Sequence, residues 1–319
     1  MIPLKYTPNE EKENKFYELI VQNRNSSFLY DINEKCKRIF QGKEFKEIIL
    51  LAPEELRNLY YTLKSHPNYK QIKDEFTQIN NICNKENNYI VKVLYQGMPQ
   101  EAKQLIYEQA GMDVCPYCNR NFIEKLKINK SIQRMYSGTF QLDHFYPKDE
   151  FPMFAVSFYN LIPVCGTCNS IKNNTNFNIY PYLQEIKDNI SFRYDLLGCD
   201  YMENSEAIKL QIVSSNEEAL EDAKNLHLEE IYNKHKDIVQ EIITKMKYYN
   251  PTYIKSLISS TGLLFTDENE LYRLLYGGYA NPDEFGKRPL SKFIKDIYLD
   301  TKSSINTFDI FSNTLNNEE

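Results

Sequence analysis

Four cysteines form two pairs whose spacing suits metal binding. The pairs are Cys115-Pro-Tyr-Cys118 and Cys165-Gly-Thr-Cys168, and both have two residues between the thiols. Each tight turn directs two thiolates toward one ion, and two such turns complete a tetrahedron around Zn²⁺. The pattern therefore predicts one structural zinc held by Cys115, Cys118, Cys165 and Cys168. Because four sulfurs leave no open coordination position, any chemistry must lie on other residues nearby.

The same cysteines also allow two disulfides, or buried thiols that bind nothing. The shared spacing favours zinc, and the segment Met1-Ile2-Pro3-Leu4-Lys5 becomes charged too early for a secretory signal. The other cysteines, Cys36, Cys83 and Cys199, stand alone, which argues against an extracellular disulfide framework. No run of about 18 apolar residues is present, so no membrane span is expected. These features predict reduced cysteines and a cytoplasmic location.

An Asp-His pair lies between the two cysteine pairs. Residues 138–144 alternate well enough for a short strand, which places Asp143 and His144 at its end. Residues 160–164, Asn-Leu-Ile-Pro-Val, predict a second short strand that leads into the second cysteine pair. The run after Cys168 begins a helix with Asn169 near its N-terminus. Strand, strand and helix would then be held together by one zinc ion.

This arrangement resembles the HNH family of ββα-metal nucleases, in particular its members whose core is held by two C-x2-C pairs. The resemblance covers about Cys115 to Asn174 and rests on Asp143-His144, on Asn160 in Asn-Leu-Ile-Pro, and on Asn169 in Cys-Asn-x-x-Lys. Many members have histidine where this chain has Asn169, but an amide oxygen also binds a hard divalent cation. Asn173, one helical turn later, is an alternative ligand.

The resemblance implies metal-dependent hydrolysis of phosphodiester bonds. Neutral His144 would be the general base that takes a proton from the attacking water. Asp143 and Asn169 would hold one Mg²⁺ or Mn²⁺, and Asn160 would bond the backbone so that His144 keeps its orientation. The expected products carry a 5′-phosphate and a 3′-hydroxyl. A histidine after an aspartate near a strand end can also be a surface residue without a role.

The charge of the chain is unusual for a nucleic-acid enzyme. The net charge is −6, whereas residues 115–175 carry seven basic and four acidic residues, so this segment is +3 and the remainder is −9. Affinity for a phosphate backbone comes largely from lysine and arginine, so we expect the isolated chain to bind DNA weakly. Lys172 is expected to contact phosphate from the helix that carries Asn169, and Lys148 is a second candidate. Lys125, Lys127 and Lys130 suit a solvated face equally well.

The predicted fold class is α+β, with a zinc-stapled ββα-metal HNH core inserted between largely α-helical N- and C-terminal regions. The expected divisions are a helical region at 1–112, the nuclease core at 113–199 and a helical region at 200–319. Residues 99–110 predict a helix that Gly111 ends, and residues 216–248 predict a long amphipathic helix or a pair. The chain has no nucleotide-binding glycine loop, so any ATP chemistry must come from another chain.

The helical flanks, together with Cys-Pro-Tyr-Cys-Asn-Arg-Asn and Asp-His-Phe-Tyr-Pro-Lys, extend the resemblance to bacterial HNH proteins that accompany ATPases in antiphage systems, such as the Septu type. Members of that type more often have Glu-His than Asp-His. The resemblance implies an antiviral nuclease, favouring DNA, that an ATPase partner restrains or targets. One alternative is a stand-alone restriction or homing endonuclease, which should have its own sequence-specific DNA-binding domain and more basic residues in the rest of the chain. Another is a zinc-knuckle module that binds nucleic acid or protein without catalysis.

Overall fold

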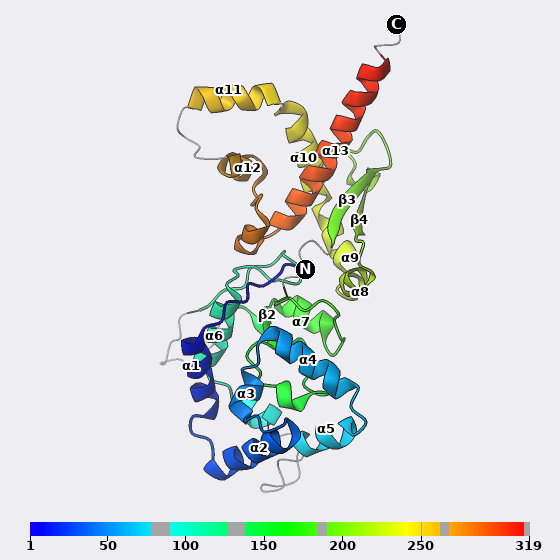
Figure 1. Ribbon diagram of the computed structural model, residues 1–319. Coiled ribbons are helices and arrows are strands. Elements are labelled where there is room, and N and C mark those ends of the chain that lie inside the picture. The colour runs from blue at the N-terminus through cyan, green and yellow to red at the C-terminus, as the bar shows by residue number, and fades with distance from the viewer. Residues whose placement is uncertain (78–89, 127–137, 184–189, 250, 262–267, 316–319) are drawn as a thin grey trace. The chain divides into compact units, whose positions relative to one another are not determined.

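The computed structural model describes residues 1–77, 90–126, 138–183, 190–249, 251–261 and 268–315 (Figure 1). The chain forms two compact units. One comprises Pro3–Tyr117 and Phe122–Lys187, and the other comprises Met1–Ile2, Cys118–Asn121 and Asp188–Glu319. Within the described residues, each unit combines helices with one two-stranded antiparallel sheet, β1-β2 in the first and β3-β4 in the second. The protein therefore has an α+β fold.

The first unit begins with a series of helices whose ends follow local sequence signals. The Asn9 side chain accepts a 2.9 Å hydrogen bond from the Lys12 backbone N–H at the start of α1, and Pro53 occupies the first turn of α4. Gly111 adopts a left-handed conformation with φ of 62° and ends α6, as its sequence predicts. The elements are α1 (Glu10–Val21), α2 (Ser26–Ile39), α3 (Phe45–Ile49), α4 (Pro53–Lys64), α5 (Tyr69–Thr77), the π-helical turn η1 (Ile90–Tyr95) and α6 (Gln100–Ala110).

A hairpin and a short helix follow in the same unit. Strands β1 (Gln141–His144) and β2 (Leu161–Val164) pair antiparallel, with Gln141 opposite Val164 and His144 opposite Leu161. Helix α7 (Gly166–Lys172) contacts β1, while α6 contacts β2. All four residues of β2 are buried, which fits a strand covered on both faces. Residues 141–144 and 161–164 are thus held in place by helices from two parts of the chain.

The connection between β1 and β2 is packed by aromatic side chains. Tyr146 stacks on Tyr60 of α4 with ring centroids 4.1 Å apart, and Phe151 packs against the same ring at 4.8 Å. The connection contains the 3₁₀ turn η2 (Pro152–Phe154). Such aromatic pairs contribute about 0.5–1.5 kcal/mol each beyond the burial of their area. The backbone that follows His144 is therefore fixed by its own core.

The second unit contains the hairpin of β3 (Ser191–Leu196) and β4 (Ile208–Val213), and α13 (Ser291–Leu315) contacts both β3 and α10 (Lys236–Tyr248). Residues 216–248, expected to form one long helix or a pair, are divided at two places. His227 has φ of 52°, and residues 233–235 form a 3₁₀ turn, η5. The result is α8 (Glu217–Asn225), α9 (Leu228–Tyr232) and α10 (Lys236–Tyr248), and the later elements are α11 (Pro251–Thr261), α12 (Glu268–Tyr276), the 3₁₀ segment η7 (Pro282–Lys287) and α13 (Ser291–Leu315).

No helix in the described part of the chain is both long enough and apolar enough to cross a bilayer.

Candidate metal and catalytic site

The four paired cysteines lie together, as their spacing predicts. Their Sγ atoms are all within 4.8 Å of one another, and all four residues are buried. Zn–S bonds of about 2.3 Å place tetrahedral sulfurs roughly 3.8 Å apart, so a small contraction of this cluster suits one Zn²⁺. No disulfide joins any of the cysteines in the described residues. Cys36 is buried, Cys199 is exposed, and Cys83 lies outside the described residues.

Backbone contacts shape the two cysteine turns, residues 115–118 (the first turn) and residues 165–168 (the second turn). Val114 and Phe122 pair across the first turn as an isolated antiparallel bridge. In the second turn Cys165 caps α7, and its carbonyl accepts a 3.1 Å hydrogen bond from the Asn169 N–H. The first turn thus comes from a narrow loop and the second from the start of a helix, which is the local geometry that two-residue cysteine spacing requires.

The residues that follow Cys118 are anchored within their own unit. The Arg120 backbone N–H donates a 3.4 Å hydrogen bond to the Cys118 sulfur. Asn119 is buried with φ of 48°, and its carbonyl accepts a 2.6 Å hydrogen bond from the Leu290 N–H. The Asn119 side chain donates to the Phe285 carbonyl at 2.8 Å. These contacts fix the end of the first cysteine turn, one of them through the Cys118 sulfur and the others through Asn119.

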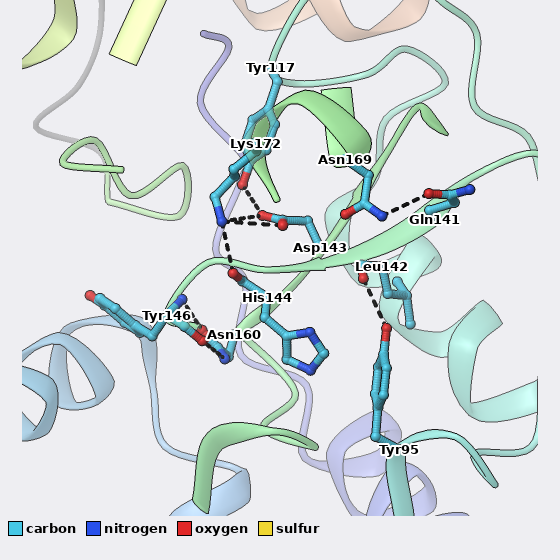
Figure 2. A network of polar contacts seen from close by, with 10 residues as sticks. All are labelled: Tyr95, Tyr117, Gln141, Leu142, Asp143, His144, Tyr146, Asn160, Asn169 and Lys172. Atoms are coloured by element: carbon cyan, nitrogen blue, oxygen red, sulfur yellow. Dashed lines mark hydrogen bonds and ion pairs between the residues drawn. The ribbon is translucent and has the colours of Figure 1, made fainter. Parts of the chain in front are cut away.

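The Asp143 carboxylate is buried on the side of β1 that faces α7. The Tyr117 hydroxyl donates a 2.6 Å hydrogen bond to Oδ2, and the Lys172 ammonium lies 3.2 Å from each carboxylate oxygen (Figure 2). Burial raises the pKa of Asp143, while the charge of Lys172 and the hydrogen bond from Tyr117 oppose that rise. The carboxyl group of Asp143 therefore has two hydrogen-bond donors, one of which is a cation.

His144 is the next residue, and its side chain lies on the opposite face of β1. Its Nε2 atom is 2.9 Å from the Ala155 carbonyl oxygen, and its ring packs edge-on against Tyr95 with centroids 4.4 Å apart. Figure 2 shows the imidazole pointing away from Asp143, as expected for adjacent residues of a strand. Burial lowers the pKa of His144 to about 3, so the imidazole is neutral near pH 7. Because a carbonyl only accepts, Nε2 carries the proton and Nδ1 keeps its lone pair.

Asn169 lies on the same side of β1 as Asp143. Its Nδ2 atom donates a 2.7 Å hydrogen bond to Oε1 of Gln141, and Gln141 shares a strand face with Asp143 because the two are two residues apart. This bond uses the amide nitrogen and leaves the Asn169 oxygen as an acceptor. A carboxylate and an amide oxygen form a donor set that suits Mg²⁺ or Mn²⁺. Asn173, the alternative ligand, is exposed at the end of α7.

Asn160 is fully buried just before β2. Its Oδ1 accepts from the Tyr146 backbone N–H at 2.8 Å, and its Nδ2 donates to the carbonyls of Tyr146 and Phe154 at 3.0 and 3.1 Å. Its own carbonyl accepts from the Phe145 N–H at 2.9 Å. One side chain therefore joins two points of the connection that begins directly after His144.

The two candidate phosphate-binding lysines differ in their surroundings. The Lys172 side chain has 0% exposure, and its ammonium also donates a 3.0 Å hydrogen bond to the His144 carbonyl. Lys148 is half-buried, with its ammonium 6.0 Å from the centre of the Tyr95 ring. Lys125 forms an ion pair with Glu108. Lys127 and Lys130 lie outside the described residues.

Three residues at this site were not expected from the sequence. Gln141 had a detectable signal, since it is two residues before Asp143 in a predicted strand and so shares its face. Tyr117 lies inside the first cysteine turn, but the spacing of the turn says nothing about where its hydroxyl reaches. Tyr95 packs on His144 and donates to the Leu142 carbonyl at 3.1 Å, from a segment 47 residues away along the chain. No local pattern indicates such a contact.

Comparison with known proteins found no matching family model, no similar curated protein and no similar solved structure.

Proposed function

We propose that this protein is a divalent-metal-dependent HNH endonuclease with a ββα-metal core, and that it hydrolyses phosphodiester bonds of nucleic acid, with DNA favoured. One observation carries the proposal. Asp143 and Asn169 present hard oxygen donors on one side of β1, and the neutral imidazole of His144 lies on the very next residue of that strand. The same hairpin and helix adjoin four clustered cysteines that suit a structural zinc.

The residues of the chain divide the chemistry between them. The Ala155 carbonyl holds the His144 proton on Nε2, so Nδ1 is the atom that accepts a proton from the attacking water. Asp143 and Asn169 would hold a Mg²⁺ or Mn²⁺ ion, which supplies Lewis-acid stabilisation of the charge that develops on the phosphate. Because the imidazole and the carboxylate lie on opposite faces of β1, the scissile phosphate must lie at the end of the strand, where both faces can be reached.

Two lysines have different roles in this proposal. Lys148 is half-buried beside Tyr95, which packs on His144, so we assign the phosphate contact to Lys148. Lys172 would have to leave Asp143 before it could reach a phosphate, because both carboxylate oxygens lie within 3.2 Å of its ammonium. Breaking a buried ion pair of this kind is costly, so we assign no phosphate contact to Lys172.

The biological role we propose is that of an antiviral effector working with an ATPase partner. The argument rests on charge. Residues 115–175 have a net charge of +3 and the rest of the chain has −9, so we expect the chain alone to bind DNA with low affinity. Co-expression with an ATPase encoded beside it should yield a stable complex whose nuclease activity depends on ATP. Full activity of the isolated chain, with no complex formed, would instead support a stand-alone endonuclease.

A second candidate is a zinc-knuckle module that binds nucleic acid or protein without catalysis. The burial of His144, at 7% exposure, and the pairing of Asp143 with Lys172 favour it, because both groups are already satisfied inside the protein. A catalytic site, in contrast, must admit water and a phosphate. Cleavage separates these two candidates directly.

The test is cleavage of supercoiled plasmid by zinc-loaded protein with Mg²⁺ or Mn²⁺. The nuclease proposal expects nicking that depends on the divalent cation, with 5′-phosphate and 3′-hydroxyl ends on the products. Binding without cleavage, under conditions in which the protein retains its zinc, would support the non-catalytic module instead. Single-stranded DNA and RNA in parallel reactions would identify the preferred substrate.

A further inference from the structure

The carboxylate of Asp143 is held by one residue of the first cysteine turn and by one residue at the end of α7, the helix that begins in the second. Tyr117 is the third residue of the first turn, Cys115-Pro-Tyr-Cys118, and its hydroxyl is 2.6 Å from Oδ2 of Asp143. Lys172 lies one helical turn after Cys168 in α7 and binds the same carboxylate. Residues four apart share one face of a helix, so the second turn and Lys172 are aligned by α7 itself.

Both donors are themselves fixed by packing. The rings of Tyr117 and Phe177 lie 5.4 Å apart, and the Lys172 ammonium lies 5.3 Å from the centre of the Phe177 ring. Tyr117, Lys172 and Phe177 are buried, with exposures of 1%, 0% and 6%. Buried side chains surrounded in this way have little rotamer freedom, so the direction of the carboxylate follows from the position of the two turns.

The two contacts restrict the carboxylate unequally. Oδ2 accepts a hydrogen bond from Tyr117 and also lies 3.2 Å from the Lys172 ammonium, whereas Oδ1 accepts a hydrogen bond from Lys172 alone among the contacts that the structure gives for Asp143. A carboxylate oxygen has two acceptor sites, so Oδ1 retains one. The donors therefore orient the group so that one oxygen keeps the capacity to bind a cation.

We infer that Tyr117 and Lys172 are positioning residues that orient Asp143 toward the divalent cation, so that the cysteine turns set the affinity of the cation site as well as the fold. The inference rests on the proposed function, because it takes Asp143 as a ligand of that cation. Hydrogen-bond partners of metal ligands commonly change metal affinity by about 10–100-fold when they are removed.

The experiment compares Mn²⁺ binding by zinc-loaded Tyr117→Phe and wild-type protein, using electron paramagnetic resonance to count unbound Mn²⁺. The substitution removes one hydroxyl and keeps the ring against Phe177. We expect about tenfold weaker Mn²⁺ binding, with zinc content and thermal midpoint close to those of the wild type. The matched control is Tyr107→Phe, because the Tyr107 hydroxyl also bonds an aspartate, Asp113, at 3.0 Å, but away from Asp143. This control should bind Mn²⁺ like the wild type.

The outcomes separate the inference from the function on which it rests. Mn²⁺ binding that is lost in Asp143→Asn but unchanged in Tyr117→Phe would overturn the inference and leave the cation site standing. Wild-type protein that binds no Mn²⁺, or binds it equally well after Asp143→Asn and Asn169→Ala, would remove the cation site and the inference together.

A second measurement avoids any dependence on the folding of Tyr117→Phe. A 3-fluorotyrosine placed at position 117 keeps the hydroxyl, and its ¹⁹F resonance should shift when Mg²⁺ is added to zinc-loaded protein. The shift should disappear in Asp143→Asn. A resonance that does not respond to Mg²⁺, in protein that binds Mn²⁺ through Asp143, would contradict the inference.

Discussion

The Nε2 atom of His144 lies 2.9 Å from the carbonyl oxygen of Ala155, across the connection between β1 and β2. This contact fixes the tautomer of the imidazole, and burial lowers the pKa of His144 to about 3. The adjacent Asp143 points to the other face of the strand and is held by Tyr117 and Lys172 (Figure 2). Two neighbouring residues thus have pKa values shifted in opposite directions, and shifted pKa values are common at functional sites.

The burial of His144 predicts how stability depends on pH. Its folded pKa is about 3 and its unfolded pKa is about 6.5, so the unfolded chain binds more protons between these values. The stability contribution is complete above pH 6.5 and falls as the pH drops toward 3, by at most about 1.4 kcal/mol per pH unit. Asp143, whose pKa is raised, acts in the opposite direction. Urea unfolding of wild type and His144→Gln across pH 4–7 isolates the His144 part. Parallel profiles for the two proteins would contradict the prediction.

Asn160→Ala should destabilise the protein. The change removes three hydrogen bonds to the backbone of Tyr146 and Phe154, and it leaves buried backbone groups unsatisfied. The expected loss in the free energy of unfolding is about 2–4 kcal/mol. Urea denaturation measures it, with Asn58→Ala on the exposed surface of α4 as the matched control, expected within about 0.5 kcal/mol of wild type. A loss at Asn160 no larger than that of the control would show that these bonds do not hold the connection.

Zinc should be bound by the paired cysteines alone. Cys165→Ser removes one sulfur from the cluster and should lower the metal content well below the expected value of about one zinc per chain. Cys199→Ser is the matched control, because Cys199 is an exposed thiol outside the cluster. Elemental analysis after dialysis gives the content, and hydrogen exchange of β1 and β2 reports the loss of structure. Equal zinc in both variants would refute the assignment of the cluster.

Lys148→Ala should weaken DNA binding in a salt-dependent way. Removing one lysine that contacts a phosphate lowers the slope of log affinity against log salt by about 1, and it does so for any sequence. Fluorescence anisotropy with a labelled duplex at several salt concentrations measures the slope. Lys43→Ala, which removes an exposed lysine two residues before α3, serves as the control and should leave the slope unchanged. The assignment of Lys148 fails if its slope equals that of the control.

The sequence predicted those parts of the protein that depend on short-range rules. Cysteine spacing predicted the four-thiol cluster, and Gly111 marked the end of α6. The burial of Lys172 was not predictable, because the motif Cys-Asn-x-x-Lys is the same whether its lysine faces solvent or contacts a carboxylate. The sequence allowed one helix or a pair over residues 216–248 but did not place the break at His227, whose φ of 52° interrupts an amphipathic pattern that continues on both sides. The contact between Tyr95 and His144 joins residues far apart in the sequence, so only the tertiary structure reveals it.

The central claim is that His144 acts as the base in metal-dependent cleavage, and single-turnover DNA cleavage tests it most directly. Zinc-loaded wild type, His144→Ala and His227→Ala would be compared in Mn²⁺, since the His227 side chain is exposed and, among the contacts described for it, bonds to Glu230 alone. The account predicts that His144→Ala is slower than wild type by about 10²–10⁴-fold, while His227→Ala cleaves at the wild-type rate. Equal rates for wild type and His144→Ala, with zinc retained in both proteins, would contradict it.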